Sequence, residues 1–151
     1  MKNLPTHFFL IGLSLIMIGS TSLFAAVPDG WIDDYQAASV LADKKGQNML
    51  LLFTGSDWCI WCKRLHEEIL DTDVFKKWAA DNIVLVYVDF PRTDYRSEAT
   101  RVQNSELDEN FDVSGYPTAI VTDSSGKELT RLSYMQGGPK TFIRAIQRAG
   151  H

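Results

Sequence analysis

The stretch DWCIWCK, residues 57–63, decides both the fold and the chemistry of this 151-residue chain. It contains Cys59 and Cys62, the only two cysteines of the sequence. The apolar run Met49–Phe53 before it predicts a buried strand, and the amphipathic stretch Lys63–Leu70 after it predicts a helix. The first turn of a helix carries unpaired N–H groups and partial positive charge, which favour a thiolate. We therefore interpret this turn as a redox site.

The two cysteines occupy different places on the predicted helix. Cys62 lies three residues before Leu65, and Leu65 lies four residues before Ile69, so these three residues share the apolar face. We expect Cys62 to face the interior of the protein. Cys59, at the helix start, is expected to be the more exposed sulfur and the nucleophile.

The first 26 residues have the layout of a secretory signal peptide. Lys2 gives a positive start, Phe8–Ile18 is apolar apart from Gly12 and Ser14, and small residues follow. The apolar core is about half the length that a transmembrane span requires. We expect residues 1–26 to be cleaved and the mature protein to be periplasmic, with an uncleaved membrane anchor as the alternative.

Charge, chain length and cysteine content narrow the possible classes of function. The formal net charge of −4 argues against a nucleic-acid partner. Residues 27–151 are expected to form one domain that is long enough to bury a core without disulfide staples. Because two cysteines in an oxidising compartment are too few for a stapled scaffold, the pair is expected to serve chemistry. A structural disulfide remains the alternative.

Hydrophobic patterning predicts an α/β fold with helices on both faces of a central four-stranded mixed sheet. Strands joined by a helix pair in parallel through a right-handed crossover, and a hairpin adds antiparallel strands. Helices are expected over residues 33–45 and 63–70, after residue 73, within 92–110 and after residue 139. Strands are expected over residues 49–53, 83–88, 119–122 and 127–134.

Three motifs in this order resemble the thioredoxin superfamily over residues 32–149. They are the cysteine turn after its strand, the segment VSGYPT at residues 113–118, and the Gly137-Gly138 pair before the last helix. The resemblance implies a cis peptide bond at Tyr116–Pro117, close to the cysteines. The signal sequence and the W-C-x-W-C pattern resemble exported bacterial oxidoreductases of the Dsb kind, nearest to the DsbH type.

The resemblance implies thiol–disulfide exchange in which Cys59 attacks a substrate disulfide and Cys62 resolves the mixed disulfide. The predicted function is a disulfide reductase for exported proteins, with an isomerase or a non-enzymatic metal-chaperone or assembly module as alternatives. No cofactor, metal or nucleic acid is expected, and the protein is expected to be a monomer. A membrane protein of the DsbD type is the implied electron donor. The expected substrate contacts are Trp58, Trp61, Tyr116 and Pro117.

One departure from thioredoxin concerns the proton of the second thiol. Thioredoxin carries a buried acid six residues before its first cysteine, where this chain has Phe53. The usual proton acceptor for Cys62 is therefore missing, and Asp57 is the nearest carboxylate in sequence and a weak substitute. His66 is expected to be a solvated helix residue rather than a base.

Overall fold

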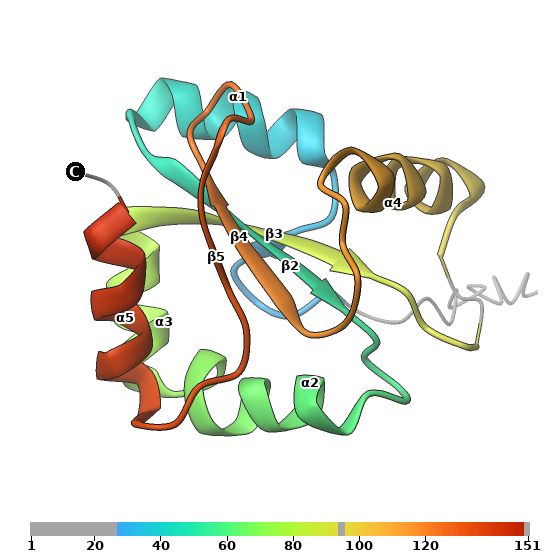
Figure 1. Cartoon of the computed structure of the whole chain (residues 1–151). Coiled ribbons are helices and arrows are strands. Elements are labelled where there is room, and N and C mark those ends of the chain that lie inside the picture. The colour runs from blue at the N-terminus through green and yellow to red at the C-terminus, as the bar shows by residue number, and fades with distance from the viewer. Residues whose placement is uncertain (1–26, 94–95, 150–151) are drawn as a thin grey trace, which may run out of the picture.

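A single mixed sheet forms the centre of the molecule in the computed structural model, which describes residues 27–93 and 96–149 (Figure 1). The predicted signal peptide lies outside the described residues. The strand order is β1-β3-β2-β4-β5, with β1, β3 and β2 parallel and with β4 antiparallel to both β2 and β5. The strands are β1 (Trp31–Ile32), β2 (Asn48–Thr54), β3 (Ile83–Asp89), β4 (Thr118–Thr122) and β5 (Glu128–Leu132).

Helices cover both faces of the sheet, as the sequence predicts (Figure 1). One face carries α1 (Tyr35–Lys45) and α4 (Glu98–Asn110). The other carries α2 (Ile60–Leu65), the π-helical segment η1 (His66–Leu70), α3 (Asp73–Asn82) and α5 (Gly138–Ala149). No helix within residues 27–93 and 96–149 combines the length and the apolar character needed to cross a bilayer.

The predicted number of four strands is wrong, because β1 adds a fifth at the sheet edge. It has two residues and pairs with β3 through Trp31 opposite Leu85 and Ile32 opposite Val86. Two residues are too few to show a strand period in the sequence. Its pairing depends on β3, more than 50 residues further along the chain, so local patterning does not report it.

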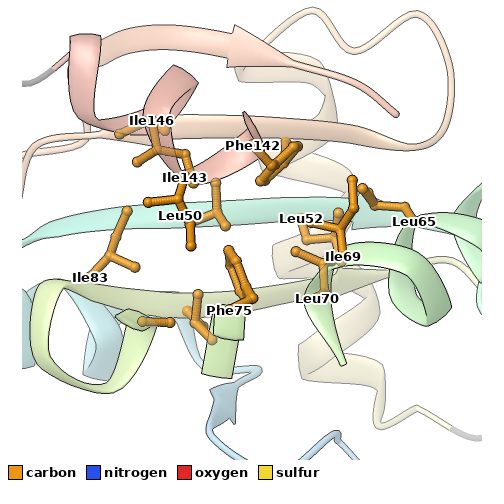
Figure 2. Packing of buried hydrophobic residues seen from close by; sticks show 14 of the residues in the cluster. Leu50, Leu52, Leu65, Ile69, Leu70, Phe75, Ile83, Phe142, Ile143 and Ile146 are labelled. Atoms are coloured by element: carbon orange, nitrogen blue, oxygen red, sulfur yellow. The ribbon is translucent and has the colours of Figure 1, made fainter. Parts of the chain in front are cut away.

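Strand β2 is apolar throughout because both of its faces are covered. Leu50 and Leu52 face the helices α2, α3 and α5, where Phe142 completes the cluster (Figure 2). Met49 and Leu51 face the opposite side, under α1 and α4. All four strand residues are completely buried. A strand held this firmly gives a fixed starting point to the turn that follows it.

Helix α1 ends at Lys45, as predicted, and begins two residues later than expected, at Tyr35. Asp34 is the N-cap, with its side chain accepting the N–H of Ala37 at 2.9 Å. Gly46 ends the helix in the left-handed conformation (φ 62°), which glycine adopts without steric cost. Thr72 likewise interrupts the helical stretch as predicted and caps α3.

Candidate active site

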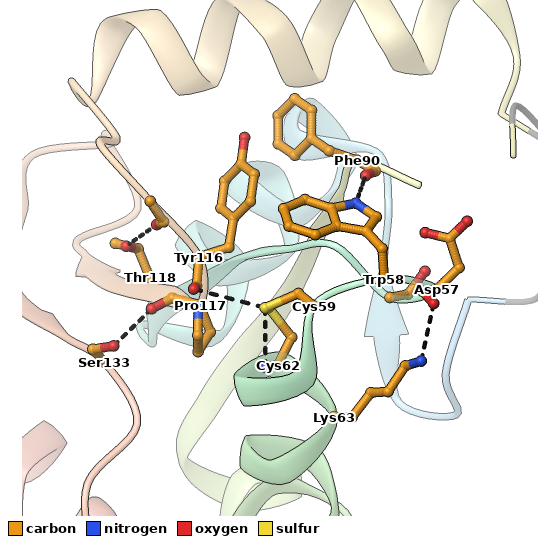
Figure 3. Close-up of a disulfide and its surroundings, with 12 residues drawn as sticks. Asp57, Trp58, Cys59, Cys62, Lys63, Phe90, Tyr116, Pro117, Thr118 and Ser133 are labelled. Carbon is orange, nitrogen blue, oxygen red and sulfur yellow. Dashed lines mark hydrogen bonds between the residues drawn. A yellow bond between two sulfur atoms is a disulfide. The ribbon is translucent and has the colours of Figure 1, made fainter. Parts of the chain in front are cut away.

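The end of β2 and the start of α2 bring the two cysteines together (Figure 3). Cys59 is the N-cap of α2, and its Sγ accepts the N–H of Cys62 at 3.2 Å. The two sulfurs form a disulfide, and the Cα atoms lie 5.2 Å apart. At this cap position the sulfur meets the unpaired N–H groups of the first helical turn, an environment that stabilises a thiolate after reduction.

The loop before β4 lies against the disulfide. Phe53 pairs with Thr118 in the sheet, so the residues just before Thr118 adjoin the cysteine turn. The Tyr116–Pro117 peptide bond is cis. The carbonyl oxygen of Tyr116 lies 3.7 Å from Sγ of Cys59, although the two residues are 57 positions apart in sequence. The two motifs therefore meet at the sulfur expected to be the nucleophile.

The two cysteine residues differ in exposure in the expected order. Cys59 is 6% exposed and Cys62 is 1% exposed. The difference is small because the oxidised pair is buried as a unit beneath the loop of Tyr116. Cys59 remains the sulfur at the surface side of the turn, and Cys62 faces inward from the helix.

Ser56, three residues before Cys59, is fixed by a buried ion pair. Asp89 accepts the Ser56 N–H at 2.9 Å and the Ser56 hydroxyl at 2.7 Å. The same carboxylate receives Nη2 of Arg96 at 3.0 Å. The side chains of Asp89 and Arg96 are 1% and 5% exposed. The end of β3 thus holds the backbone that leads into the cysteine turn.

The carboxylate of Asp57 binds the backbone after β3. It accepts the N–H groups of Arg92 and Thr93 at 3.0 to 3.1 Å and the Thr93 hydroxyl at 2.8 Å. The Arg92 N–H, above all, holds the pKa of Asp57 below its usual value, and both groups of Thr93 add to this. These bonds favour the ionised carboxylate and make it a poorer proton acceptor, in agreement with the interpretation of Asp57 as a weak substitute.

Trp58 is anchored rather than free to rotate. Its indole N–H donates to the carbonyl oxygen of Phe90 at 2.9 Å (Figure 3). The guanidinium of Arg92 lies over its ring, 5.1 Å from the centroid. Its ring meets that of Tyr116 edge to face, with centroids 6.0 Å apart. Burial, and a hydrogen bond to Asp108, raise the pKa of Tyr116, so its hydroxyl remains a donor.

Trp61, on α2, belongs to a second group of aromatic side chains, which includes Tyr134. Its ring and that of Tyr134 have centroids 5.4 Å apart, and the guanidinium of Arg64 lies over both rings. Glu68 accepts the Tyr134 hydroxyl and Nε of Arg64, both at 2.6 Å. The bond from Tyr134, followed by that from Arg64, holds the pKa of Glu68 below its usual value.

An exposed apolar surface surrounds the buried disulfide. Trp58, Ile60 and Trp61 are 38%, 72% and 50% exposed, respectively. We predicted the two tryptophans from their spacing around the cysteines, but Phe90 and Tyr134, which hold them, were missed. Both lie at the ends of other predicted strands, and nothing in a single sequence indicates that those ends meet this turn.

The expectation that His66 is solvated is wrong. Its side chain is 15% exposed, and its ring packs against those of Trp31 and Tyr87, with centroids 6.2 and 6.0 Å apart. Its Nδ1 lies 3.4 Å from Oδ1 of Asp71. Two features unseen in the sequence bury it: strand β1, which supplies Trp31, and the π-helical turn that His66 begins.

Comparison with known families gives one decisive match. The family model described as a thioredoxin-like domain matches residues 35–149, three quarters of the chain. The chain belongs to the thioredoxin-like family. This membership confirms the predicted α/β fold and explains why the cysteine turn, the Pro117 loop and the last helix occur in this order.

Relatives of known function within the thioredoxin-like family carry Dsb names. The disulfide bond reductase DsbH of Chlamydia pneumoniae is 32% identical over 78% of this chain and 70% of its own. The thioredoxin-related protein DsbJ of the same organism is 28% identical over 68% of this chain, which spans only 29% of DsbJ. DsbD of Actinobacillus pleuropneumoniae is 34% identical over half of this chain and 12% of its own length.

Solved structures agree with this grouping. The structure of a DsbH oxidoreductase superposes with a TM-score of 0.74 at 30% identity, covering 84% of this chain and 91% of that one. Thioredoxin from Thermus thermophilus shares the fold at a TM-score of 0.60 and 19% identity. The predicted resemblance to the DsbH type and the predicted enzyme class, a protein-disulfide oxidoreductase, are confirmed by this homology.

Proposed function

We propose that this protein reduces disulfide bonds in exported proteins through Cys59 and Cys62. The observation that carries the proposal is the disulfide at the start of α2, with Cys59 at the cap and Cys62 one turn inside. The similarity to a protein named disulfide bond reductase supports the reducing direction. The absence of a histidine between the cysteines in the sequence also favours a moderate thiolate over a strongly oxidising one.

The proposed reaction has two exchange steps. In the first, the thiolate of Cys59 bonds to one sulfur of a substrate disulfide, and the other substrate sulfur leaves as a thiolate. In the second, Cys62 bonds to Sγ of Cys59, and the remaining substrate sulfur leaves. The substrate gains two electrons and the enzyme ends as the observed disulfide. The helix start contributes about 0.3–1 kcal/mol to the first thiolate, and the Cys62 N–H adds a direct hydrogen bond.

Reduction of insulin by dithiothreitol tests this function. The mature protein at catalytic concentration is expected to accelerate precipitation of the insulin B chain, and alkylation of the reduced cysteines is expected to abolish the acceleration. Precipitation no faster than with dithiothreitol alone would contradict the proposal. Recovery of scrambled ribonuclease without net reduction would assign the protein to the isomerases instead.

The exposed apolar surface around Cys59 is proposed to bind an extended substrate segment. Trp58, Trp61, Tyr116 and Pro117 are the proposed contact residues, and the exposed Ile60 extends the surface. Exposed aromatic side chains that are held in place bind a partner at little entropic cost. Trp58 and Trp61 are held in this way by Phe90 and Tyr134, respectively.

Replacing Trp61 with alanine is expected to raise KM for insulin about thirtyfold, because tryptophans buried at interfaces contribute about 2 kcal/mol. The rate with a small aromatic disulfide is expected to change less than twofold, since that substrate needs no extended contact. Val40→Ala is the matched control, because Val40 is also exposed and apolar but lies on α1. Equal loss with both substrates would mean that Trp61 supports the turn and not the substrate.

We further propose that residues 1–26 are a cleaved signal peptide, that residues 27–151 form the mature domain, and that it acts as a monomer in the periplasm. A reductase in that compartment requires an electron donor, and the similarity to part of DsbD supports a membrane protein of that type. Amino-terminal sequencing of the exported protein tests the cleavage, with Val27 as the expected first residue. A start at Met1 in the membrane fraction would favour an anchor.

A further inference from the structure

The proposed exchange needs a base near Cys62, because its thiol must lose a proton before the sulfur can attack Cys59. In thioredoxin, the strand position six residues before the first cysteine carries a buried acid. In this chain that position is Phe53, which is completely buried among apolar groups. Asp57 is bound to the backbone at Arg92 and Thr93. Neither residue serves as the acceptor.

A pocket of about 260 Å³ lies beside Cys62, and His66 forms part of its wall. The backbone N–H of His66 donates to the carbonyl oxygen of Cys62, so the two residues are joined by one regular helical turn. Side chains four residues apart on a helix have Cβ atoms about 5–6 Å from each other. Cys62 and His66 thus lie one helical turn apart on the wall of the same pocket.

The π-helical turn gives His66 its partner. The carbonyl oxygen of His66 accepts the N–H of Asp71, five residues later, at 2.8 Å. This wide turn also places Oδ1 of Asp71 3.4 Å from Nδ1 of His66. Residues five apart on a regular α-helix point about 140° away from each other. Single π-helical turns occur frequently at functional sites, where they redirect side chains.

The other ring nitrogen of His66 is positioned as a proton acceptor. When Nδ1–H donates to Asp71, Nε2 carries the lone pair. Nε2 is buried and has no hydrogen-bond partner among residues 27–93 and 96–149. The rings of Trp31 and Tyr87 fix the imidazole in this orientation. A histidine held by a carboxylate, with its second nitrogen directed to a reacting group, is the usual arrangement of a general base.

We propose that His66, oriented by Asp71, accepts the proton of Cys62 when Cys62 resolves the mixed disulfide. The inference rests on the proposed exchange function. The proton passes from Sγ of Cys62 to Nε2 of His66. The Cys62–Cys59 bond forms, the bond from Cys59 to the substrate breaks, and the substrate leaves as a thiolate. The imidazolium, stabilised by the Asp71 carboxylate, then releases its proton to solvent or to that thiolate.

Several charged groups surround the ring and set the pH dependence of this step. Burial, followed by the Asp89 carboxylate, raises the pKa of Tyr87 to about 12, so Tyr87 stays protonated throughout the range of the test. The charged and titratable groups of the pocket and its border are Lys63, Glu67, Asp71, Tyr87 and the Asp89–Arg96 pair behind Ser56. Because Lys63, Asp89 and Arg96 are common to the variants below, differences between variants report on the imidazole.

Stopped-flow reaction of the reduced protein with 5,5′-dithiobis(2-nitrobenzoate) separates the two steps. Attack by Cys59 releases the first thionitrobenzoate, and resolution by Cys62 releases the second. His66→Gln is expected to keep the first phase within twofold of native and to slow the second about tenfold at pH 7, which is about an order of magnitude less than the smallest usual general-base effect. The second phase should then rise only as a thiol ionises by itself, near pH 8.5.

Two further variants make the test decisive. Asp71→Asn leaves the imidazole in place but removes its negative partner, and we expect a smaller slowing of the second phase, about threefold. Glu106→Gln removes an exposed carboxylate on α4, on the opposite face of the sheet, and is expected to leave both phases unchanged. A second phase for His66→Gln within twofold of native from pH 6 to 9 would overturn the inference. Absence of the first phase in the native protein would instead remove the proposed function.

Discussion

Cys59→Ser is expected to lower insulin reduction below about one thousandth of the native rate, because serine supplies no thiolate at neutral pH. The cap geometry explains why Cys59 carries the attack. Its Sγ receives the Cys62 N–H at 3.2 Å and lies at the Tyr116 loop. The exposed tryptophans Trp58 and Trp61 come before and after Cys59 in the sequence. The rate is measured as B-chain precipitation at equal protein concentration.

Cys62→Ser is the matched control, because it keeps the nucleophile and removes only the resolving sulfur. This variant should form a stoichiometric mixed disulfide with a substrate, visible by mass spectrometry under non-reducing conditions. Cys59→Ser should trap little, since Cys62 is 1% exposed and faces inward. Trapping by Cys59→Ser and not by Cys62→Ser would reverse the two roles.

Local patterns predicted the parts of the fold that local physics decides. Strand β2 was evident because both of its faces are buried, which requires an unbroken apolar run. The extent of α1 was predicted to within two residues, because the capping by Asp34 and Gly46 depends on a few neighbouring residues. The cysteine pair was evident for the same reason, because both cysteines lie within four consecutive residues, 59–62.

The features of the site that the sequence did not reveal depend on contacts between distant segments. The turn before Cys59 is fixed by residues 32 to 36 positions later, through Ser56, Asp57 and Trp58 in succession. The bonds of Asp57 to residues 92–93 were missed because no local feature of the sequence indicates them. His66 looked solvated for a similar reason, because its burial depends on β1 and on a π-helical turn.

Arg96→Leu is expected to lower the free energy of unfolding by about 3–5 kcal/mol, because it leaves the charge of Asp89 buried without its partner. The Asp89 and Arg96 side chains are 1% and 5% exposed and their charged atoms are 3.0 Å apart. Solvent therefore cannot replace the lost guanidinium. The two hydrogen bonds from Ser56 remain but carry no compensating positive charge. Urea unfolding followed by circular dichroism measures the change.

The double variant Asp89→Asn with Arg96→Leu distinguishes the ion pair from simple loss of packing. Removing both charges eliminates the unpaired carboxylate, so at least about half of the lost stability should return. An amide at position 89 can still accept one bond from Ser56, which should keep the cysteine turn in place and disulfide exchange close to native. If the double variant is as unstable as Arg96→Leu, the arginine acts through packing, and the charge of Asp89 is not what holds the turn.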